Sequence, residues 1–111
     1  MKRYILALDL VPDEKMISAY EDWHRRVWPG VKRSIVDSGI LHMAIYRFAD
    51  RLCMVMETTN EFTLEKKAAS DAANTIVQEW EALMWKYQRQ IPGSKPGEKW
   101  VLMNKIFEIN S

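Results

Sequence analysis

The stretch ILHMAIYRFADRLCMVMET, residues 40–58, decides how this chain of 111 residues folds. Apolar residues dominate 40–48 and 52–58, and only Ala49-Asp50-Arg51 separates the two runs. So short a link between two strand-like runs predicts an antiparallel hairpin. Because successive side chains of a strand point to opposite faces, Met43 and His42 would lie on different faces of this hairpin.

The segments on both sides of the hairpin complete the pattern. Alternating apolar residues predict further strands over 3–11 and 100–109. Apolar residues spaced three and four apart predict helices over residues 14–27, 29–38 and 76–87. We expect a further short helix, residues 63–69, within the polar stretch 59–75. Two Pro-Gly pairs within residues 88–99 predict a loop. This order predicts a single α+β domain, residues 1–111, with the βαββαβ arrangement of a ferredoxin-like sandwich.

The second face of the predicted sheet needs a cover. In a ferredoxin-like sandwich the helices pack on one face of the sheet only. The opening strand is apolar on nearly both of its faces. We therefore expect a homodimer, in which the sheets of two copies meet and form a dimeric α+β barrel.

The composition argues against several classes of function. Sixteen basic and fifteen acidic residues give a net charge of +1 without a basic cluster, which argues against a nucleic-acid partner. Cys53 is the one cysteine, so no intrachain disulfide can form and a reducing compartment is indicated. Residues 1–13 resemble neither a signal peptide nor a membrane span. We expect a cytoplasmic protein with no membrane partner.

Metal and cofactor motifs are also missing from the sequence. It contains no glycine-rich phosphate loop and no GxSxG, CxxC or HExxH motif. His24 and His42 are too few for most transition-metal sites, so we expect no metal and no cofactor. One histidine could still hold a haem, which leaves that alternative open.

The segment YEDWHRRVWP, residues 20–29, carries the most chemical information. Spacings of four put Tyr20, His24 and Trp28 on one face of a helix. That face offers a hydroxyl, an imidazole and a flat apolar platform. Such a stripe is more often part of a core or an interface, but a buried imidazole needs hydrogen-bond partners, and a wet pocket supplies them.

The pattern YxxxHxxxWP resembles the signature helix of the L-rhamnose mutarotases. The similarity covers most of the chain and includes the opening strand, Ser38-Gly39, Ala44-Ile45-Tyr46, the strand Leu52–Glu57, Ala69-Ser70-Asp71 and Trp80. The resemblance implies an isomerase that interconverts the α and β anomers of a 6-deoxyhexose without cofactor or metal. It names L-rhamnose as the first candidate substrate.

The resemblance also implies a role for each site residue. His24 matches the proton donor of the family, Tyr20 matches a sugar-contacting tyrosine, and Trp80 matches one of two tryptophans that form a flat wall. Met43 stands where the family has another sugar-contacting tyrosine, and Glu81 stands where it has the second tryptophan. Both replacements alter the expected substrate-binding wall, so L-fucose is an alternative substrate.

Two further alternatives lie outside this family. One is a small monooxygenase or haem-binding protein on the same dimeric barrel, which would also account for the tryptophan and methionine content. The other is a non-catalytic ligand-sensing module, for which His24 would be dispensable.

Overall fold

The computed structural model describes all 111 residues. The strands are β1 (Lys2–Leu10), β2 (Ile40–Phe48), β3 (Arg51–Thr58), β4 (Gln88–Arg89) and β5 (Val101–Leu102). The helices are α1 (Glu14–His24), α2 (Pro29–Asp37), α3 (Leu64–Ala72) and α4 (Thr75–Trp85). The predicted hairpin, the opening strand and the four helices are confirmed.

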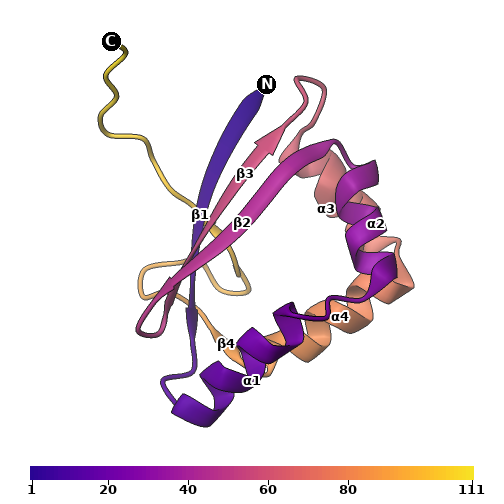
Figure 1. The fold of residues 1–111 in the computed structure, drawn as a ribbon, viewed down its shortest axis with the longest axis vertical. Coiled ribbons are helices and arrows are strands. Elements are labelled where there is room, and N and C mark those ends of the chain that lie inside the picture. The colour runs from indigo at the N-terminus through magenta and orange to yellow at the C-terminus, as the bar shows by residue number, and fades with distance from the viewer.

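All strands belong to one antiparallel sheet, and all helices lie on one side of it (Figure 1). The strand order is β2-β3-β1-β4, and β5 also pairs with β1. This arrangement is a ferredoxin-like α+β fold, which confirms the predicted fold class. No helix combines the length and the apolar character needed to cross a bilayer.

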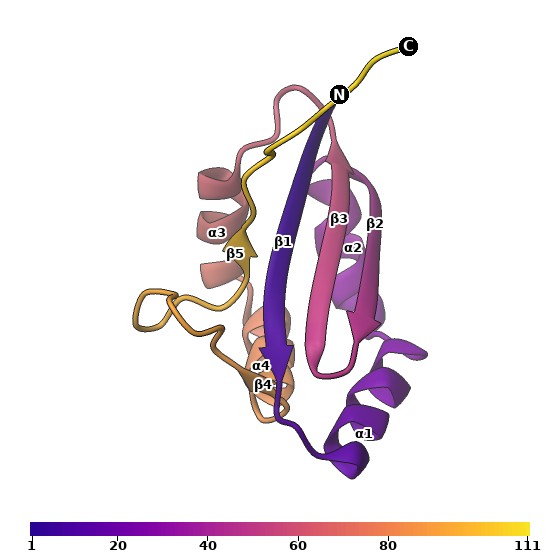
Figure 2. The same ribbon diagram turned by 90° about the vertical axis from the view of Figure 1, so that its left-hand side faces the viewer.

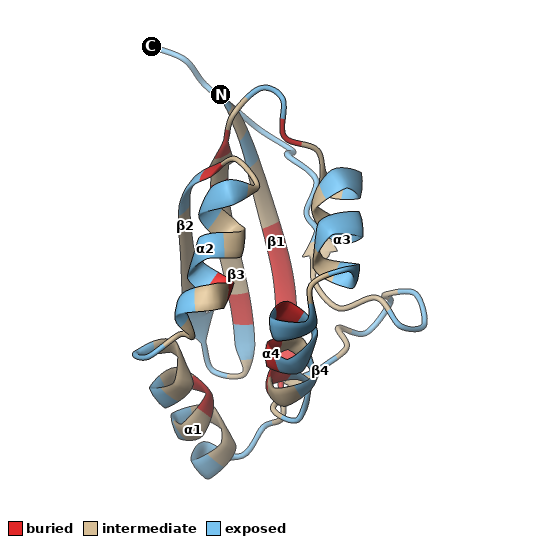
Figure 3. Cartoon of the chain, turned by 90° about the vertical axis from the view of Figure 1, so that its right-hand side faces the viewer, coloured by how far each residue is buried: buried red, intermediate tan, exposed pale blue.

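The register between β1 and β3 turns one apolar face of both strands toward the helices. Leu6 pairs with Met54 and Leu8 with Leu52, and directly opposed residues share a face of the sheet. Leu8 is fully buried. Figure 3 shows the buried residues along β1 and β3 and on α1 and α4. Each such side chain contributes roughly 1.5–3 kcal/mol on burial, so this row holds the helices on the sheet.

Helix α1 is shorter than the sequence predicts, because it ends at His24 rather than at residue 27. Its start is fixed by Asp13, whose carboxylate accepts two backbone N–H groups of the first turn. Pro29 prevents α1 from continuing into α2, since the residue before a proline is driven out of the helical region. Trp28 accordingly has extended backbone (ψ 136°) and is the N-cap of α2. The expectation that Trp28 shares one helical face with Tyr20 and His24 is therefore wrong.

The last predicted strand is also mostly wrong. Of the predicted strand over 100–109, only β5 pairs with β1. One more hydrogen bond follows, from the Met103 N–H to the Ile5 carbonyl oxygen at 2.8 Å. The tail over 104–111 then leaves the sheet (Figure 1). Alternating apolar residues make a strand only where a neighbouring backbone accepts and donates hydrogen bonds. Conversely, β4 forms inside the predicted loop over 88–99, because β1 offers it such a neighbour.

The middle of the sheet face that carries no helices is apolar, with an ion pair near each end of β1, and this face is turned toward the viewer in Figure 2. Its rows include Ile5, Val55 and Ala44, which lie directly opposite one another. At one end of β2, Tyr46 and Phe48 are 63% and 85% exposed. The C-terminal tail adds three more exposed apolar side chains, Ile106, Phe107 and Ile109.

We expect Gly39→Ala to destabilise the fold more than the matched control Gly93→Ala. Both glycines have left-handed φ values, +98° and +94°, which cost an L-residue roughly 1–2 kcal/mol. A Cβ at Gly39 would lie 2.9 Å from Thr59 Oγ1, whereas one at Gly93 would meet nothing within 4 Å. Moving Thr59 off its rotamer adds about 1 kcal/mol to the loss in free energy of unfolding. Urea unfolding measures both variants, and equal losses would contradict the contact.

Candidate active site

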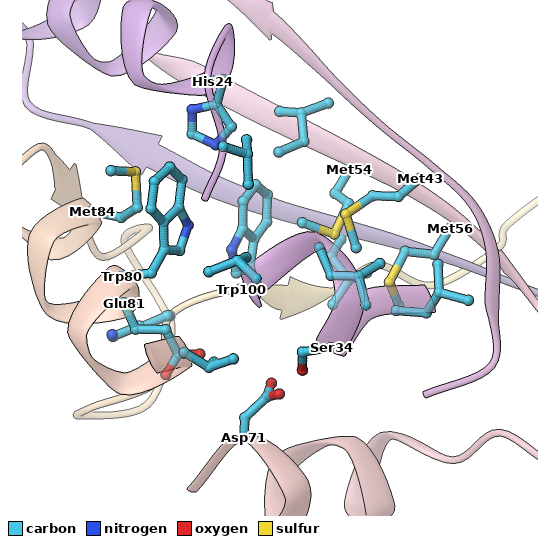
Figure 4. A pocket seen from close by; sticks show the side chains of 18 of the residues that line it. His24, Ser34, Met43, Met54, Met56, Asp71, Trp80, Glu81, Met84 and Trp100 are labelled. Atoms are coloured by element: carbon cyan, nitrogen blue, oxygen red, sulfur yellow. The ribbon is translucent and has the colours of Figure 1, made fainter. Parts of the chain in front are cut away.

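A cavity of about 300 Å³ lies between the helix layer and the sheet. Most of its lining is apolar, from β1, β2, β3 and all four helices. Figure 4 shows His24 at one end, Trp80 and Trp100 beside it, and a row of methionines along the strands. Every site residue named from the sequence lines this cavity, namely His24, Tyr20, Trp80, Met43 and Glu81.

His24 is fixed in one orientation by the helix that carries it. It is the last residue of α1, and its Nδ1 lies 2.8 Å from the Tyr20 carbonyl oxygen, one turn earlier. Because a carbonyl oxygen only accepts, Nδ1 carries the proton and donates. The neutral imidazole therefore keeps Nε2 as its proton-accepting nitrogen. A short α1 that ends at this residue thus places an imidazole of defined tautomer in the cavity wall.

Tyr20 contributes a hydroxyl that stays protonated. Its side chain is 3% exposed, and its oxygen accepts a hydrogen bond from Gln88 Nε2 at 3.0 Å. Burial raises the pKa of Tyr20 to about 12, and the hydrogen bond from Gln88 lowers it only in part. The phenol ring lies against the His24 ring, with centroids 4.5 Å apart. A neutral hydroxyl and an imidazole therefore sit side by side at one end of the cavity.

Trp80 is the centre of an aromatic group that holds this end together. Its ring meets those of Trp28, His24 and Trp23 edge-on, at centroid distances of 5.2, 5.8 and 6.3 Å. Trp28 thus reaches the site through Trp80 and not along a shared helix with Tyr20. Trp80 is itself 8% exposed and presents an apolar wall to the cavity.

Met43 and Glu81 lie in different parts of the lining. Met43 stands beside Met54 and Met56 along the strands, so the cavity is soft and apolar there (Figure 4). Glu81 is half-buried, and its Oε1 accepts from Gln78 Nε2 at 3.2 Å. Glu81 is therefore part of the cavity wall, at the position where the resemblance implies a wall residue.

Several lining residues were not singled out from the sequence. Gln88, which binds the Tyr20 hydroxyl, lay in a predicted loop. Three others lie in polar stretches of the sequence, on helices that turn only one side toward the cavity: Ser34, Lys67 and Asp71. The spacing of four between Lys67 and Asp71 was the one signal that could have found them.

His24 also lines a second cavity of about 480 Å³. Tyr20, Met43 and Ile45 line both cavities. The second cavity is charged, and Arg47 Nε meets Glu21 Oε2 there at 2.8 Å. The imidazole thus lines both a largely apolar cavity and a second one that contains an ion pair.

The other histidine lies away from this site. His42 is exposed on β2 and faces Glu57 in the sheet register, on the face that carries no helices. No group of three or more His, Cys, Asp and Glu side chains is placed to hold a metal ion.

Comparison with known proteins assigns the family. The family model described as L-rhamnose mutarotase matches residues 3–109. An L-fucose mutarotase from Xanthomonas campestris pv. campestris is 44% identical over 112 residues, which is 99% of this chain and 90% of the relative. The family model thus spans every residue that lines the cavity.

Solved structures agree at the level of the fold. An L-rhamnose mutarotase from Formosa agariphila superposes with a TM-score of 0.73 at 18% identity, over 99% of this chain and 100% of that one. Tetracenomycin F2 cyclase from Streptomyces glaucescens superposes with a TM-score of 0.67 at 13% identity, over 100% of this chain and 99% of that one. One fold therefore serves different reactions, and the sequence match decides between them. The chain belongs to the L-rhamnose mutarotase family and is a carbohydrate isomerase, a sugar mutarotase of the rhamnose and fucose type.

Proposed function

We propose that this chain interconverts the α and β anomers of L-fucose, with L-rhamnose as the second candidate. The observation that carries the reaction is His24, held by the Tyr20 carbonyl with Nε2 as acceptor, beside the protonated Tyr20 hydroxyl. The choice of sugar is supported by the name of the relative that is 44% identical, an L-fucose mutarotase. The sequence alone placed L-rhamnose first.

One nitrogen can serve both proton transfers of the reaction. His24 Nε2 takes the proton from the anomeric hydroxyl, O1 becomes the aldehyde oxygen, and the bond from C1 to the ring oxygen breaks. The ring oxygen leaves with the electron pair and takes the same proton back from the imidazolium. Both oxygens are bonded to C1, so neither lies far from Nε2. Rotation of the aldehyde and the reverse sequence close the ring as the other anomer.

Tyr20 stabilises the charge that develops during ring opening. Its hydroxyl can donate a hydrogen bond to the oxygen that becomes negative, and a pKa of about 12 keeps it from giving up the proton outright. Trp80 and the methionines on β2 and β3 would receive the C–H face and the methyl group of the sugar. The enclosing walls limit the water around these groups, which strengthens such hydrogen bonds.

Replacing His24 should abolish the reaction while leaving the fold intact. We expect His24→Ala to lower the rate of enzyme-catalysed anomer exchange roughly 10²–10⁴-fold, because the proton carrier is lost. Exchange NMR on L-fucose and on L-rhamnose, with catalytic amounts of protein, measures the rate. His42→Ala is the matched control, since this histidine lies outside the cavity, and it should keep the wild-type rate. A His24→Ala protein that is folded and fully active would overturn the assignment.

The Tyr20 hydroxyl should matter separately from its ring. We expect Tyr20→Phe to reduce kcat/KM about tenfold, the value of one hydrogen bond to a charged group. Tyr87→Phe is the control, because Tyr87 also loses only a hydroxyl, one that accepts from Trp23 Nε1 at 3.2 Å outside the cavity lining. Equal effects of the two changes, measured by the same exchange experiment, would count against a direct role for Tyr20.

We also propose that the chain works as a homodimer through the sheet face without helices. The apolar rows of that face, with Tyr46 and Phe48 exposed at one end, need a cover of matching character. A solved neighbour with a TM-score of 0.57 and 14% identity is described as a dimeric ferredoxin-like protein. A second copy would bury both sheets at once.

Charge placed on this face should separate the subunits. Sedimentation at micromolar concentration should give a dimeric mass for the natural chain and a monomeric mass for Tyr46→Glu, because the new carboxylate would be buried without a partner. Val36→Glu is the control, since Val36 is similarly exposed, at 68%, but lies on α2. A monomeric natural chain, or equal masses for all three proteins, would contradict the interface.

A further inference from the structure

The end of the cavity away from His24 is polar, and four side chains form it. These are Ser34, Lys67, Asp71 and Glu81, and all four line the cavity. Figure 4 shows the two carboxylates and the Ser34 hydroxyl gathered on the side away from His24. They come from three helices, α2, α3 and α4. A largely apolar chamber therefore has hydrogen-bonding groups at two opposite ends.

An ion pair forms part of the polar end. Lys67 and Asp71 lie one turn apart on α3, and the Lys67 ammonium donates to Asp71 Oδ1. Their side chains are only 16% and 17% exposed. A pair this deep gives back much of its attraction as desolvation, so it adds little to stability compared with apolar packing. A polar ligand in the cavity would replace the hydrogen bonds to water that these two groups lose on burial.

Gln78 links Glu81 to the backbone of Asp71. Gln78 Nε2 donates to the Asp71 carbonyl oxygen at 2.9 Å and to Glu81 Oε1 at 3.2 Å. One amide thus ties the end of α3 to the carboxylate on α4. Glu81 is held beside the cavity as a hydrogen-bond acceptor.

The length of the cavity suits a sugar that touches both ends. Val77 and Met84 both line it, and seven residues of α-helix rise about 10 Å. Tyr20 and Gln88 lie near the end of α4, and Asp71 lies near its start, where Gln78 binds it. In a pyranose, C4 lies across the ring from C1. With C1 at His24, the 3- and 4-hydroxyls point toward the polar end.

We propose that Ser34, Lys67, Asp71 and Glu81 bind the 3- and 4-hydroxyls of the sugar and select an axial 4-hydroxyl. This inference rests on the proposed mutarotase function. An axial 4-hydroxyl gathers the C–H bonds of C3, C4 and C5 on the opposite face of the ring. That apolar face packs on an aromatic wall, which Trp80 supplies. A sugar with an axial 4-hydroxyl thus presents its hydroxyls to the polar end of the cavity and its C–H bonds to Trp80.

The test compares L-fucose with 6-deoxy-L-glucose, which differs from it only at C4. We expect the natural chain to give at least a tenfold higher kcat/KM for L-fucose by exchange NMR. Glu81→Gln and Asp71→Asn should each lower kcat/KM for L-fucose about tenfold, mainly through KM, because each weakens a hydrogen bond to a charged group. In both variants the preference over 6-deoxy-L-glucose should shrink to less than threefold.

Glu79→Gln is the matched control, because Glu79 is exposed on the same helix and does not line the cavity. It should keep both the rate and the preference. Should Asp71→Asn fail to fold after losing its ion pair, Glu81→Gln decides alone, since Glu81 pairs with no cation. Equal kcat/KM of the natural chain for the two sugars, or an unchanged preference in Glu81→Gln, would overturn the inference. A natural chain that exchanges neither of these sugars nor L-rhamnose would instead refute the proposed function.

Discussion

The antiparallel pairing of β1 with β3 is the interaction on which the rest of the structure depends. Its register places Leu6 and Leu8 beside Met54 and Leu52, and the helices pack on this row of side chains. A slip of one residue would turn these side chains to the opposite face and remove the floor of the cavity. The same register leaves the rows of Ile5 on the other face, where we propose a second copy binds.

The site combines the end of one helix with the middle of another. α1 stops at His24, and the imidazole lines two cavities there. Trp80 then connects this end to α4 and to the start of α2 through edge-on ring contacts. An imidazole with a fixed tautomer, a protonated phenol and an aromatic wall are the groups that the proposed proton transfer at an anomeric carbon uses.

The two ends of the cavity divide the work between chemistry and recognition. Tyr20 and His24 carry groups suited to proton transfer, which any aldopyranose requires. We propose that Asp71 and Glu81 are the acceptors that distinguish one arrangement of hydroxyls from another. The family shares a reaction, whereas the named sugars of its members differ, L-rhamnose in one and L-fucose in another. The proposed recognition end would allow the sugar to change while the proton carrier stays.

The sequence by itself determined the order of elements, the hairpin over 40–58 and the pair Tyr20 and His24, because strand alternation and helical spacing are local properties. Tertiary structure decided the rest. Residues after Met103 alternate like a strand but leave the sheet, since pairing needs a neighbour that periodicity does not reveal. Lys67 and Asp71 looked like ordinary surface residues, and only the packing of three helices around one chamber turned them inward.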